Sequence, residues 1–410
     1  MQPAGARPVR LVVRDDVLER SRLTVLLRAL LALPLVVWTT LRALAALSVA
    51  IGCWLLLLIE RQAPRSLHDF VASYVRYATQ VSAYCLLAAN PYPWFRCQDA
   101  YPIDLEIPPP DRQGRWGVVF RLPLALPAIL LSLALGGGLV VGGVDTWSAS
   151  QDDPAAPLAA TAATSAGAAA VAAFLSWFAI LVRGRAPRGL RDLVLFAVAY
   201  AAQTSAYLLL LTPRYPSSDP ALAEPYSHLA KHPVRVVLAD DLERPRLTVL
   251  FRPLLALPHL VWLTLWSLAA GLAATGAWVS ALAAGRVPTL LHRFLAAYVR
   301  YAAHVTAFLL VVGRRFPGFT GSAGSYEVEI EIEPPMRQSR WKTLLRLLLA
   351  LPAFLLAGAL GGVLLVVGAL GFPYALVARR MPEGLRNLGA ACVRYSAQTS
   401  AFALLLTDRY

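Results

Sequence analysis

Apolar and polar positions follow one pattern four times along the chain, and each repetition has the same four parts. A short stretch alternates apolar and polar residues, at 10–13, 103–107, 234–238 and 328–332. A long apolar run follows, then a polar corner ending in proline, then a helix-length segment with regularly spaced polar residues. Alternation with β-branched residues predicts a half-buried strand, and the last segment predicts an amphipathic helix. The chain therefore consists of four copies of one module.

The repeats divide the chain at residues 8–97, 101–216, 232–319 and 325–410, with a linker at 217–231. The first and third alternating stretches are basic or neutral, while the second and fourth are acidic. We therefore expect neighbouring strands to pair across opposite charges, and all four strands to lie on one side, where they could join one sheet. Because each stretch is short, extended linkers are the alternative to strands.

The long apolar runs place the chain among integral membrane proteins. Residues 23–59 would form a helix of about 55 Å, whereas a bilayer core is about 30 Å thick. The run must bend, lie partly in the interface or turn back. Repeat 2 carries an insertion near residues 145–168, which marks a turn and favours a membrane hairpin in each repeat. This mainly α-helical fold has about eight crossings; the alternative is an interfacial or kinked first helix with a crossing amphipathic helix.

Composition and charge agree with a membrane location. Hydrophobic residues make up 58% of the chain and charged residues 15%, whereas soluble domains average about half and a quarter. The net charge of +14 comes almost wholly from arginine, and the arginines flank apolar segments instead of forming a soluble basic face. This arrangement favours membrane lipid as the partner and argues against nucleic acid. By the positive-inside rule, the basic corners face the cytoplasm and the insertion faces the other side.

Two sets of recurrent polar residues are the candidate functional positions. The first is an arginine six residues before a proline in each apolar run: Arg28, Arg121, Arg252 and Arg346. A charge at membrane depth is a functional candidate, while the simpler interpretation is that each arginine extends to the interface and binds lipid phosphate.

The second set lies on one face of the amphipathic helices, where arginine and tyrosine suit the level of lipid headgroups. It consists of Arg76, Tyr77, Gln80, Tyr200, Gln203, Arg300, Tyr301, His304, Arg394, Tyr395 and Gln398.

Catalytic and metal-binding motifs are not recognisable in the sequence. None of the six histidines joins a serine or cysteine in a known signature. His228 and His232 have a spacing that fits a metal site, but Pro225 and Pro233 favour a linker and a third ligand is missing. We therefore expect no metal, no cofactor and no enzymatic activity.

Three motifs give the chain a resemblance to a known family. They are the arginine- and leucine-rich phrase at 246–259, the Gly-Arg-Val-Pro corner at 285–288 and the terminal Leu-Thr-Asp-Arg-Tyr at 406–410. They resemble the domain of unknown function DUF4389, in tandem copies over nearly the whole chain. The resemblance implies an uncharacterised multi-pass protein of the bacterial cell (inner) membrane and supplies no catalytic residues. Repeat 2 departs from the pattern, since Ala199 replaces the helix arginine.

Two functions fit these features. A non-enzymatic scaffold or envelope protein would use the recurrent arginines and tyrosines to contact anionic lipid or membrane-protein partners. The alternative is a transporter or channel, because duplicated halves and polar positions at Gln80, Gln203, His304 and Gln398 fit a pseudo-symmetric pathway. That alternative requires the four side chains to converge on one cavity.

Overall fold

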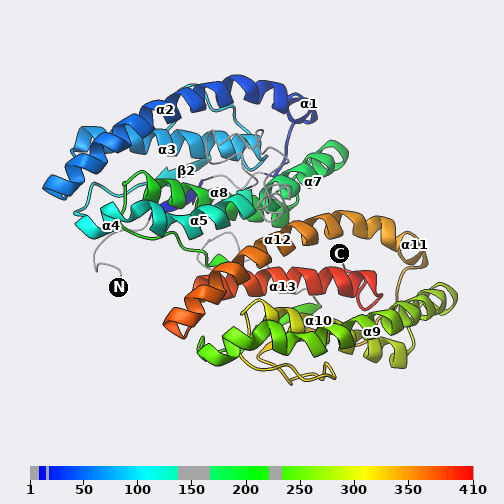
Figure 1. Cartoon of the computed structure of the whole chain (residues 1–410). Helices are drawn as coiled ribbons and strands as arrows, with labels where there is room; N and C mark the ends of the chain where they lie inside the picture. The colour runs from blue at the N-terminus through cyan, green and yellow to red at the C-terminus, as the bar shows by residue number, and fades with distance from the viewer. Residues whose placement is uncertain (1–8, 15–17, 137–166, 221–232, 410) are drawn as a thin grey trace, which may run out of the picture. The chain divides into compact units, whose positions relative to one another are not determined.

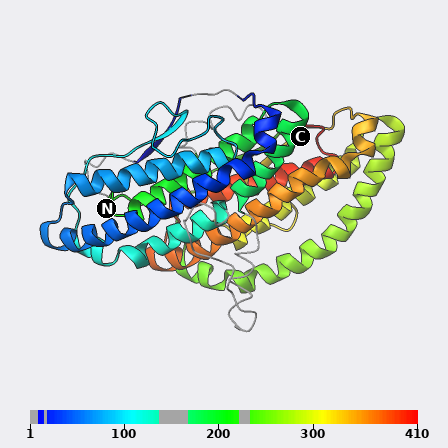
Figure 2. The same ribbon diagram turned by 90° about the horizontal axis from the view of Figure 1, so that it is seen from above.

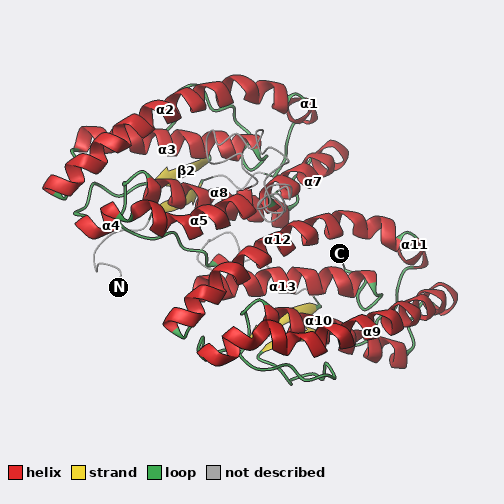
Figure 3. Cartoon of the chain, viewed as in Figure 1, coloured by secondary structure: helices red, strands yellow, loops and turns green. Residues whose placement is uncertain are grey.

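Helices dominate the structure, a computed structural model that describes residues 9–14, 18–136, 167–220 and 233–409 (Figures 1 and 3). Twelve helices and two small sheets lie in this described part of the chain. The chain divides into Met1–Ser217, which we call unit 1, and Ser218–Tyr410, which we call unit 2. Each unit holds two repeats.

The two units follow one plan. Repeat 1 supplies β1 (Arg10–Val13), α1 (Arg22–Leu26), α2 (Arg28–Glu60) and α3 (Arg65–Cys85). Repeat 2 supplies β2 (Ile103–Glu106), α4 (Arg115–Val119), α5 (Arg121–Gly136), α7 (Ala168–Arg183) and α8 (Arg188–Leu208). In unit 2, repeat 3 supplies β3 (Val234–Leu238), α9 (Arg246–Ala284) and α10 (Thr289–Leu309). Repeat 4 supplies β4 (Val328–Ile332), α11 (Arg340–Leu344), α12 (Arg346–Ala378) and α13 (Glu383–Ala403). The units differ in that α9 is continuous where repeat 1 has α1 and α2, and α12 is continuous where repeat 2 has α5 and α7.

The predicted strands form, and they pair across opposite charges as expected. β1 and β2 are antiparallel with Arg10 opposite Glu106, and β3 and β4 are antiparallel with Arg235 opposite Glu331. The expectation of one common sheet is wrong, because each unit builds its own two-stranded sheet. The pairing joins the two repeats of a unit.

In repeats 1, 3 and 4 the long apolar runs form continuous helices, which corrects the hairpins expected there. α2, α9 and α12 each run unbroken through Pro34, Pro258 and Pro352 respectively, and Figure 2 shows α9 as one curved rod. These runs consist mainly of leucine and alanine, strong helix formers, and lack the polar cluster that would let the backbone turn. In repeat 2, α5 and α7 both pack on α8. The insertion between them lies, up to residue 166, outside the described residues.

Each polar corner reverses the chain by the same geometry. The long helix ends at a residue with positive φ, which is Arg61, Gly184, Gly285 or Arg379. A left-handed residue stops a helix and turns the chain. A proline follows as the N-cap of the next helix, where its fixed φ and missing N–H carry little cost.

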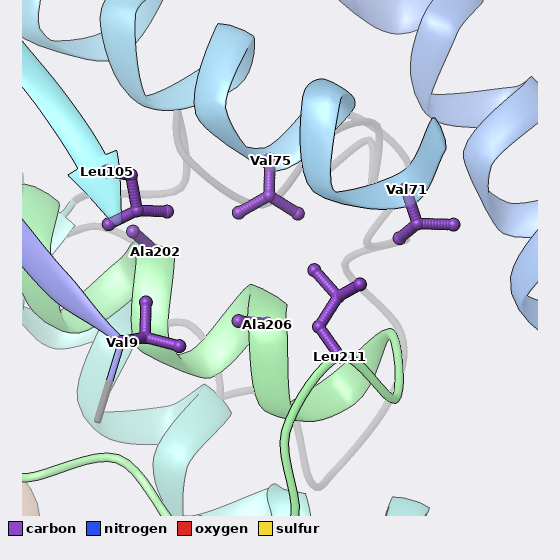
Figure 4. Packing of buried hydrophobic residues seen from close by; sticks show 7 residues of the cluster. All are labelled: Val9, Val71, Val75, Leu105, Ala202, Ala206 and Leu211. Atoms are coloured by element: carbon purple, nitrogen blue, oxygen red, sulfur yellow. The ribbon is translucent and has the colours of Figure 1, made fainter. Parts of the chain in front are cut away.

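The amphipathic helices form the centre of each unit. In unit 1, α3 and α8 contact each other; α2 packs on α3, α5 and α7 pack on α8, and the strands pack on both central helices. Figure 4 shows the apolar core between them, formed by Val9, Val71, Val75, Leu105, Ala202, Ala206 and Leu211. Unit 2 has the same plan, with α10 and α13 at the centre. These helices are therefore covered by other elements of the unit, and their expected position at the level of lipid headgroups stays a prediction.

The two repeats of a unit are interlocked through their backbones. Near the start of repeat 1, Arg20 N donates to Gly184 O in the corner of repeat 2, and Ala186 N donates to Leu18 O. Reciprocally, Gln113 N of repeat 2 donates to Arg61 O. Unit 2 has matching bonds from Arg244 to Arg379, from Met381 to Leu242 and from Gln338 to Gly285. A repeat therefore completes its structure only with its partner repeat.

Three helices are long and apolar enough to cross a membrane: α2, α9 and α12. This count refers to the described residues only. The eight crossings expected from the sequence stay a prediction.

Candidate functional site

The four arginines of the apolar runs lie inside the units, each next to the end of an amphipathic helix. Arg28 Nη1 donates to Tyr84 O at 2.9 Å and to Ala89 O at 3.1 Å. Arg252 Nη1 and Arg346 Nη1 donate to Phe308 O and Phe402 O, both at 2.6 Å. The guanidinium group of each arginine, Arg121 included, lies over the last aromatic ring of that helix, at 4.2 to 4.8 Å from its centroid.

The chemistry of these contacts is helix termination. The last carbonyls of a helix have no intrahelical donor and carry the negative end of the helix dipole, so a guanidinium group satisfies both the hydrogen bonds and the charge. Here the chain leaves the helix through a buried left-handed residue, which is Leu87, Leu210, Val311 or Leu405. The left-handed conformation costs free energy for leucine, and it costs more for the β-branched Val311. The arginine helps to hold a turn that the local sequence disfavours.

A second side chain from the same repeat supports each turn. Gln113 Nε2 donates to Leu210 O at 2.6 Å, and Gln338 Nε2 donates to Leu405 O. In repeats 1 and 3 an arginine takes this place: Arg20 Nη2 donates to Ala88 O, and Arg244 Nη2 donates to Val312 O. The amide and the guanidinium group are interchangeable here because the turn needs only an N–H donor.

The burial of Arg28, Arg121, Arg252 and Arg346 corrects the expectation that they reach lipid phosphate. All four are at least 96% buried, and their donors are directed to the chain itself. Their recurrence reflects a shared structural requirement, the closure of the amphipathic helix.

Sequence reasoning missed a second set of arginines, which closes the long helices between repeats. Arg22 donates to Val182 O at the end of α7, and Arg115 donates to Ile59 O at the end of α2. Arg246 and Arg340 donate to Val377 O and Ala283 O, at the ends of α12 and α9. Each of these arginines stands six residues before an arginine of the first set, a signal that the sequence contains.

Tryptophans of the long helices strengthen the same junctions. Trp54 Nε1 donates to Val118 O, Trp177 Nε1 to Val25 O and Trp278 Nε1 to Thr343 O. Each acceptor lies in a short helix, or the equivalent segment, of the partner repeat. The junctions between repeats are therefore closed in both directions, by exposed arginines from one repeat and by partly buried tryptophans from the other.

The four polar positions of the amphipathic helices bind separate segments. Gln80 Nε2 donates to Gln98 O at 2.8 Å, and Gln98 N donates to Gln80 Oε1 at 3.2 Å. Gln203 Nε2 donates to Val9 O, and Gln398 Nε2 donates to Val234 O, each at the start of a strand. His304 lies beside Glu329 of β4, with 3.7 Å between Nε2 and Oε2. These side chains fasten strands and connectors to the central helices.

The tyrosines of this face are also internal. Tyr77, Tyr200 and Tyr301 are buried, and Tyr301 Oη lies 2.8 Å from His259 Nδ1. Tyr395 is partly buried. The expected headgroup contact therefore does not apply to the three buried tyrosines.

The arginines of the amphipathic helices bind the acidic strands. Arg76 makes a paired contact with Asp104 of β2, at 3.1 and 2.7 Å, and also reaches Asp99. These hydrogen bonds raise the pKa of Arg76 above its ordinary value. Arg300 donates from Nε to Ile330 O at 2.9 Å and lies 3.6 Å from Glu329. Arg394 is partly buried on α13.

His304 on α10 and Glu329 on β4 form a buried pair in which both groups have shifted pKa values. Burial, with a smaller effect of Arg300, lowers the pKa of His304 to about 4. Burial raises the pKa of Glu329, and Arg300 opposes that rise. Both ring nitrogens of His304 and both carboxylate oxygens of Glu329 are buried without a hydrogen bond.

Metal ligation finds no support in the described part of the chain, which has no group of three His, Cys, Asp or Glu side chains suited to an ion. His228 and His232 lie outside the described residues.

The fold defines the class of protein: a helical tandem-repeat protein in which pairs of repeats interlock and long apolar helices face outward. The chain belongs to the family described as domain of unknown function DUF4389, which matches residues 22–96, 157–218, 246–320 and 340–410. The four matches confirm the resemblance and the tandem copies. The second match leaves out α4 and α5, in agreement with the departures of repeat 2. No match was found among the curated proteins or the solved structures.

Proposed function

We propose that this protein is a non-enzymatic scaffold of the bacterial cell membrane, in which the long helices contact lipid and the repeat pairs form rigid bodies. The observation that carries the proposal is the exposed surface of α2, α9 and α12. Leucine, valine, isoleucine and tryptophan side chains are exposed along α2 from Leu30 to Ile59. Large apolar side chains are also exposed along α9, and along the first part of α12 from Leu347 to Leu355. Such a surface is costly in water and favourable in lipid.

The placement of charge supports the same proposal. Arg28, Arg252 and Arg346 are buried against helix ends, and Arg42, the other arginine within α2, donates to Ser73 and covers Tyr77. The outer faces of these helices therefore present apolar groups to their surroundings. A bilayer accepts such helices because their backbone hydrogen bonds are satisfied internally.

The use of polar groups supports a scaffold over a transporter or an enzyme. Gln80, Gln203 and Gln398 are engaged with separate main-chain segments, so they supply no common pathway. The other recurrent donors close helix ends. A molecule whose polar side chains are used for internal closure is suited to holding a shape and presenting surfaces to membrane-protein partners.

Membrane fractionation of cells that produce the full chain tests the location. We expect the protein to remain in the membrane pellet after alkaline carbonate extraction and to need detergent for release. Recovery in the soluble fraction would overturn the proposal.

Reconstitution tests the scaffold assignment. Proteoliposomes should show no increase in permeability to ions or small polar solutes over protein-free vesicles. The matched control is the Gln80→Leu/Gln398→Leu variant, which should show the same permeability as wild type. Flux that depends on those two side chains would favour the transporter instead.

A further inference from the structure

The two ends of each unit carry basic corners that lie beside exposed apolar side chains. Corner A combines α1 with residues 183–188, and corner B combines α4 with residues 61–65. In unit 2, corner C combines the first turn of α9 with residues 379–383, and corner D combines α11 with residues 285–289. Every corner is built from both repeats of its unit.

One position is conspicuously apolar in all four corners. The residue after the helix-closing arginine is Leu23, Trp116, Leu247 or Trp341, and their exposed fractions are 66%, 77%, 73% and 76%. Further apolar side chains are exposed one turn later, such as Leu27, Phe120, Phe251 and Leu345. Exposed leucine and tryptophan next to arginine are typical of a surface that enters the headgroup region of a membrane.

The charge of the corners complements an anionic surface. Arg183, Arg185 and Arg188 are exposed at corner A, and Arg61 and Arg65 at corner B. Corner A also contains an open hollow of about 400 Å³, lined by Glu19, Arg20, Ser21 and residues 183–185. Exposed arginines are also present at the other two corners: Arg379 and Arg380 at corner C, and Arg286 and Arg340 at corner D. Arginine binds phosphate oxygens in a paired geometry.

Connectivity puts the two corners of a unit at opposite ends of the long helices. α2 begins at corner A and ends at corner B, and α9 runs from corner C to corner D. If α2 crossed the membrane, one of its basic corners would have to be moved to the far side. The positive-inside rule opposes that transfer, whereas helices that lie along the membrane keep both corners at one surface.

The length of the helices supports the second arrangement. α2 has 33 residues and α9 has 39, which correspond to about 50 Å and 58 Å, against a bilayer core of about 30 Å. Apolar side chains are exposed to the very ends of α2, since Leu30 is 65% and Ile59 is 71% exposed. A crossing helix would leave about 20 Å of this surface outside the core unless it tilted far beyond the usual range.

From these observations we infer that both corners of each unit bind the anionic phospholipid headgroups of one membrane surface, with the long helices lying along that leaflet. This inference rests on the proposed membrane location and names the lipid and the side chains that bind it. The arginines that close the helices hold the short segments in place, and the exposed arginines of the corners contact the phosphate groups.

Sidedness measurements test the common surface. Arg65→Cys and Arg188→Cys place a thiol at the first residue of α3 and of α8, equivalent positions in corners B and A. A membrane-impermeant maleimide is added to spheroplasts and to inverted membrane vesicles, with wild type as the measure of labelling at the native cysteines. Both introduced thiols should react in the same one of these two preparations and stay unreactive in the other. Reaction of one in spheroplasts and the other in inverted vesicles would overturn the inference while leaving the membrane location intact.

Retained lipid tests the headgroup contact. The purified full chain should keep phosphatidylglycerol in preference to phosphatidylcholine when both are supplied, as read by mass spectrometry. The Arg65→Gln/Arg188→Gln variant should retain several-fold less phosphatidylglycerol. The Arg96→Gln/Arg315→Gln variant, which removes the same charge from exposed positions outside the corners, should match wild type. Equal loss in both variants, or loss of bound nucleic acid instead of lipid from the first, would overturn the inference.

Discussion

Units 1 and 2 have the same fold but different polar side chains where the first central helix meets the acidic strand. In unit 1, Gln80 is saturated by the main chain of Gln98, and Arg76 holds Asp104 in a paired contact. In unit 2, His304 replaces the glutamine and Glu329 replaces the aspartate, and neither finds a hydrogen bond. Glu329 has longer ion-pair contacts instead, at 3.6 Å with Arg300 and 3.7 Å with His304, which stabilise a buried carboxylate less than short hydrogen bonds do. The comparison shows that the same fold accepts short hydrogen bonds between the central helix and the acidic strand in unit 1, and a more loosely paired histidine and glutamate in unit 2.

The largest expected difference concerns the arginines that close the central helices. Arg346 binds Asp408 at 3.0 Å in addition to two carbonyls, whereas Arg28 has the neutral Asn90 at that place. Arg346→Met should therefore destabilise unit 2 by about 3 to 5 kcal/mol, because it removes four hydrogen bonds and leaves Asp408 with Lys342 as its ion-pair partner. Arg28→Met should cost unit 1 less. Calorimetric unfolding in detergent, with hydrogen exchange at the ends of α13 and α3, measures both effects.

Equal destabilisation by the two substitutions would show that the carbonyl contacts dominate and that Asp408 adds nothing. Arg346→Lys serves as the control, since it keeps a charge and some of the donors.

The next largest expected difference is the loss of stability in acid, which should be greater in unit 2 than in unit 1. The folded-state pKa of His304 is about 4, below its ordinary value of 6.5, so the unfolded chain binds more protons between these values. The stability that neutral His304 contributes is present above pH 6.5 and is lost as the pH falls toward 4. The full effect is about 3 kcal/mol. Glu329 offsets part of it, because its raised pKa makes the folded state take up a proton.

His304→Gln tests this effect by giving unit 2 the side chain of unit 1. Unfolding followed between pH 7 and pH 4 should show a smaller acid loss in the variant than in wild type. Gln80→His is the reciprocal change and should make unit 1 more sensitive to acid. Identical pH profiles for His304→Gln and wild type would contradict the assignment.

A smaller difference is expected between the arginines that face the strands. Arg76→Gln leaves the buried Asp104 with Arg14 as its remaining ion-pair partner and Leu105 N as a donor, so unit 1 should lose about 2 kcal/mol. Arg300 lies farther from Glu329 and donates chiefly to a carbonyl. Arg300→Gln should therefore cost about 1 kcal/mol. Thermal unfolding of both variants, compared with the Asp104→Asn and Glu329→Gln single variants, distinguishes loss of the ion pair from loss of packing.

The smallest effect belongs to the strand pairs. Arg10 faces Glu106 in unit 1 and Arg235 faces Glu331 in unit 2. Reversing one charge, as in Arg235→Glu, should destabilise unit 2 by about 0.5 kcal/mol, and Arg235→Glu/Glu331→Arg should restore it. The same cycle at Arg10 and Glu106 should give a similar value. A double variant no more stable than the single one would show that the charges do not interact.

Local periodicity is sufficient to predict the strands, the amphipathic helices and the antiparallel pairs within each unit. The alternating stretches became strands because side-chain alternation is a property of the strand itself, and the charges of Arg10 and Glu106 indicated which strands meet. The hairpins predicted for repeats 1, 3 and 4 are wrong because the insertion that indicates a turn is present in repeat 2 alone. Repeats 1, 3 and 4 have an uninterrupted apolar run, and nothing in it terminates a helix.

The role of the recurrent arginines could not be predicted because their acceptors are main-chain carbonyls, which every residue carries. Arg28 and Tyr84, Arg252 and Phe308, and Arg346 and Phe402 are each 56 residues apart. That constant separation was the available signal. It indicates a contact within the repeat, whereas charge and hydropathy alone point to lipid.

The exchange of helix ends between repeats also sets an order for biogenesis. The end of α2 is closed by Arg115, which is synthesised only after repeat 1 is complete. The end of α7 is closed by Arg22, which is synthesised long before α7 itself. A nascent chain that stops between these repeats is an unfinished product with open helix ends. One that reaches Ser217 contains both partners of each of these contacts. The helix ends of unit 1 can therefore be closed before unit 2 is synthesised.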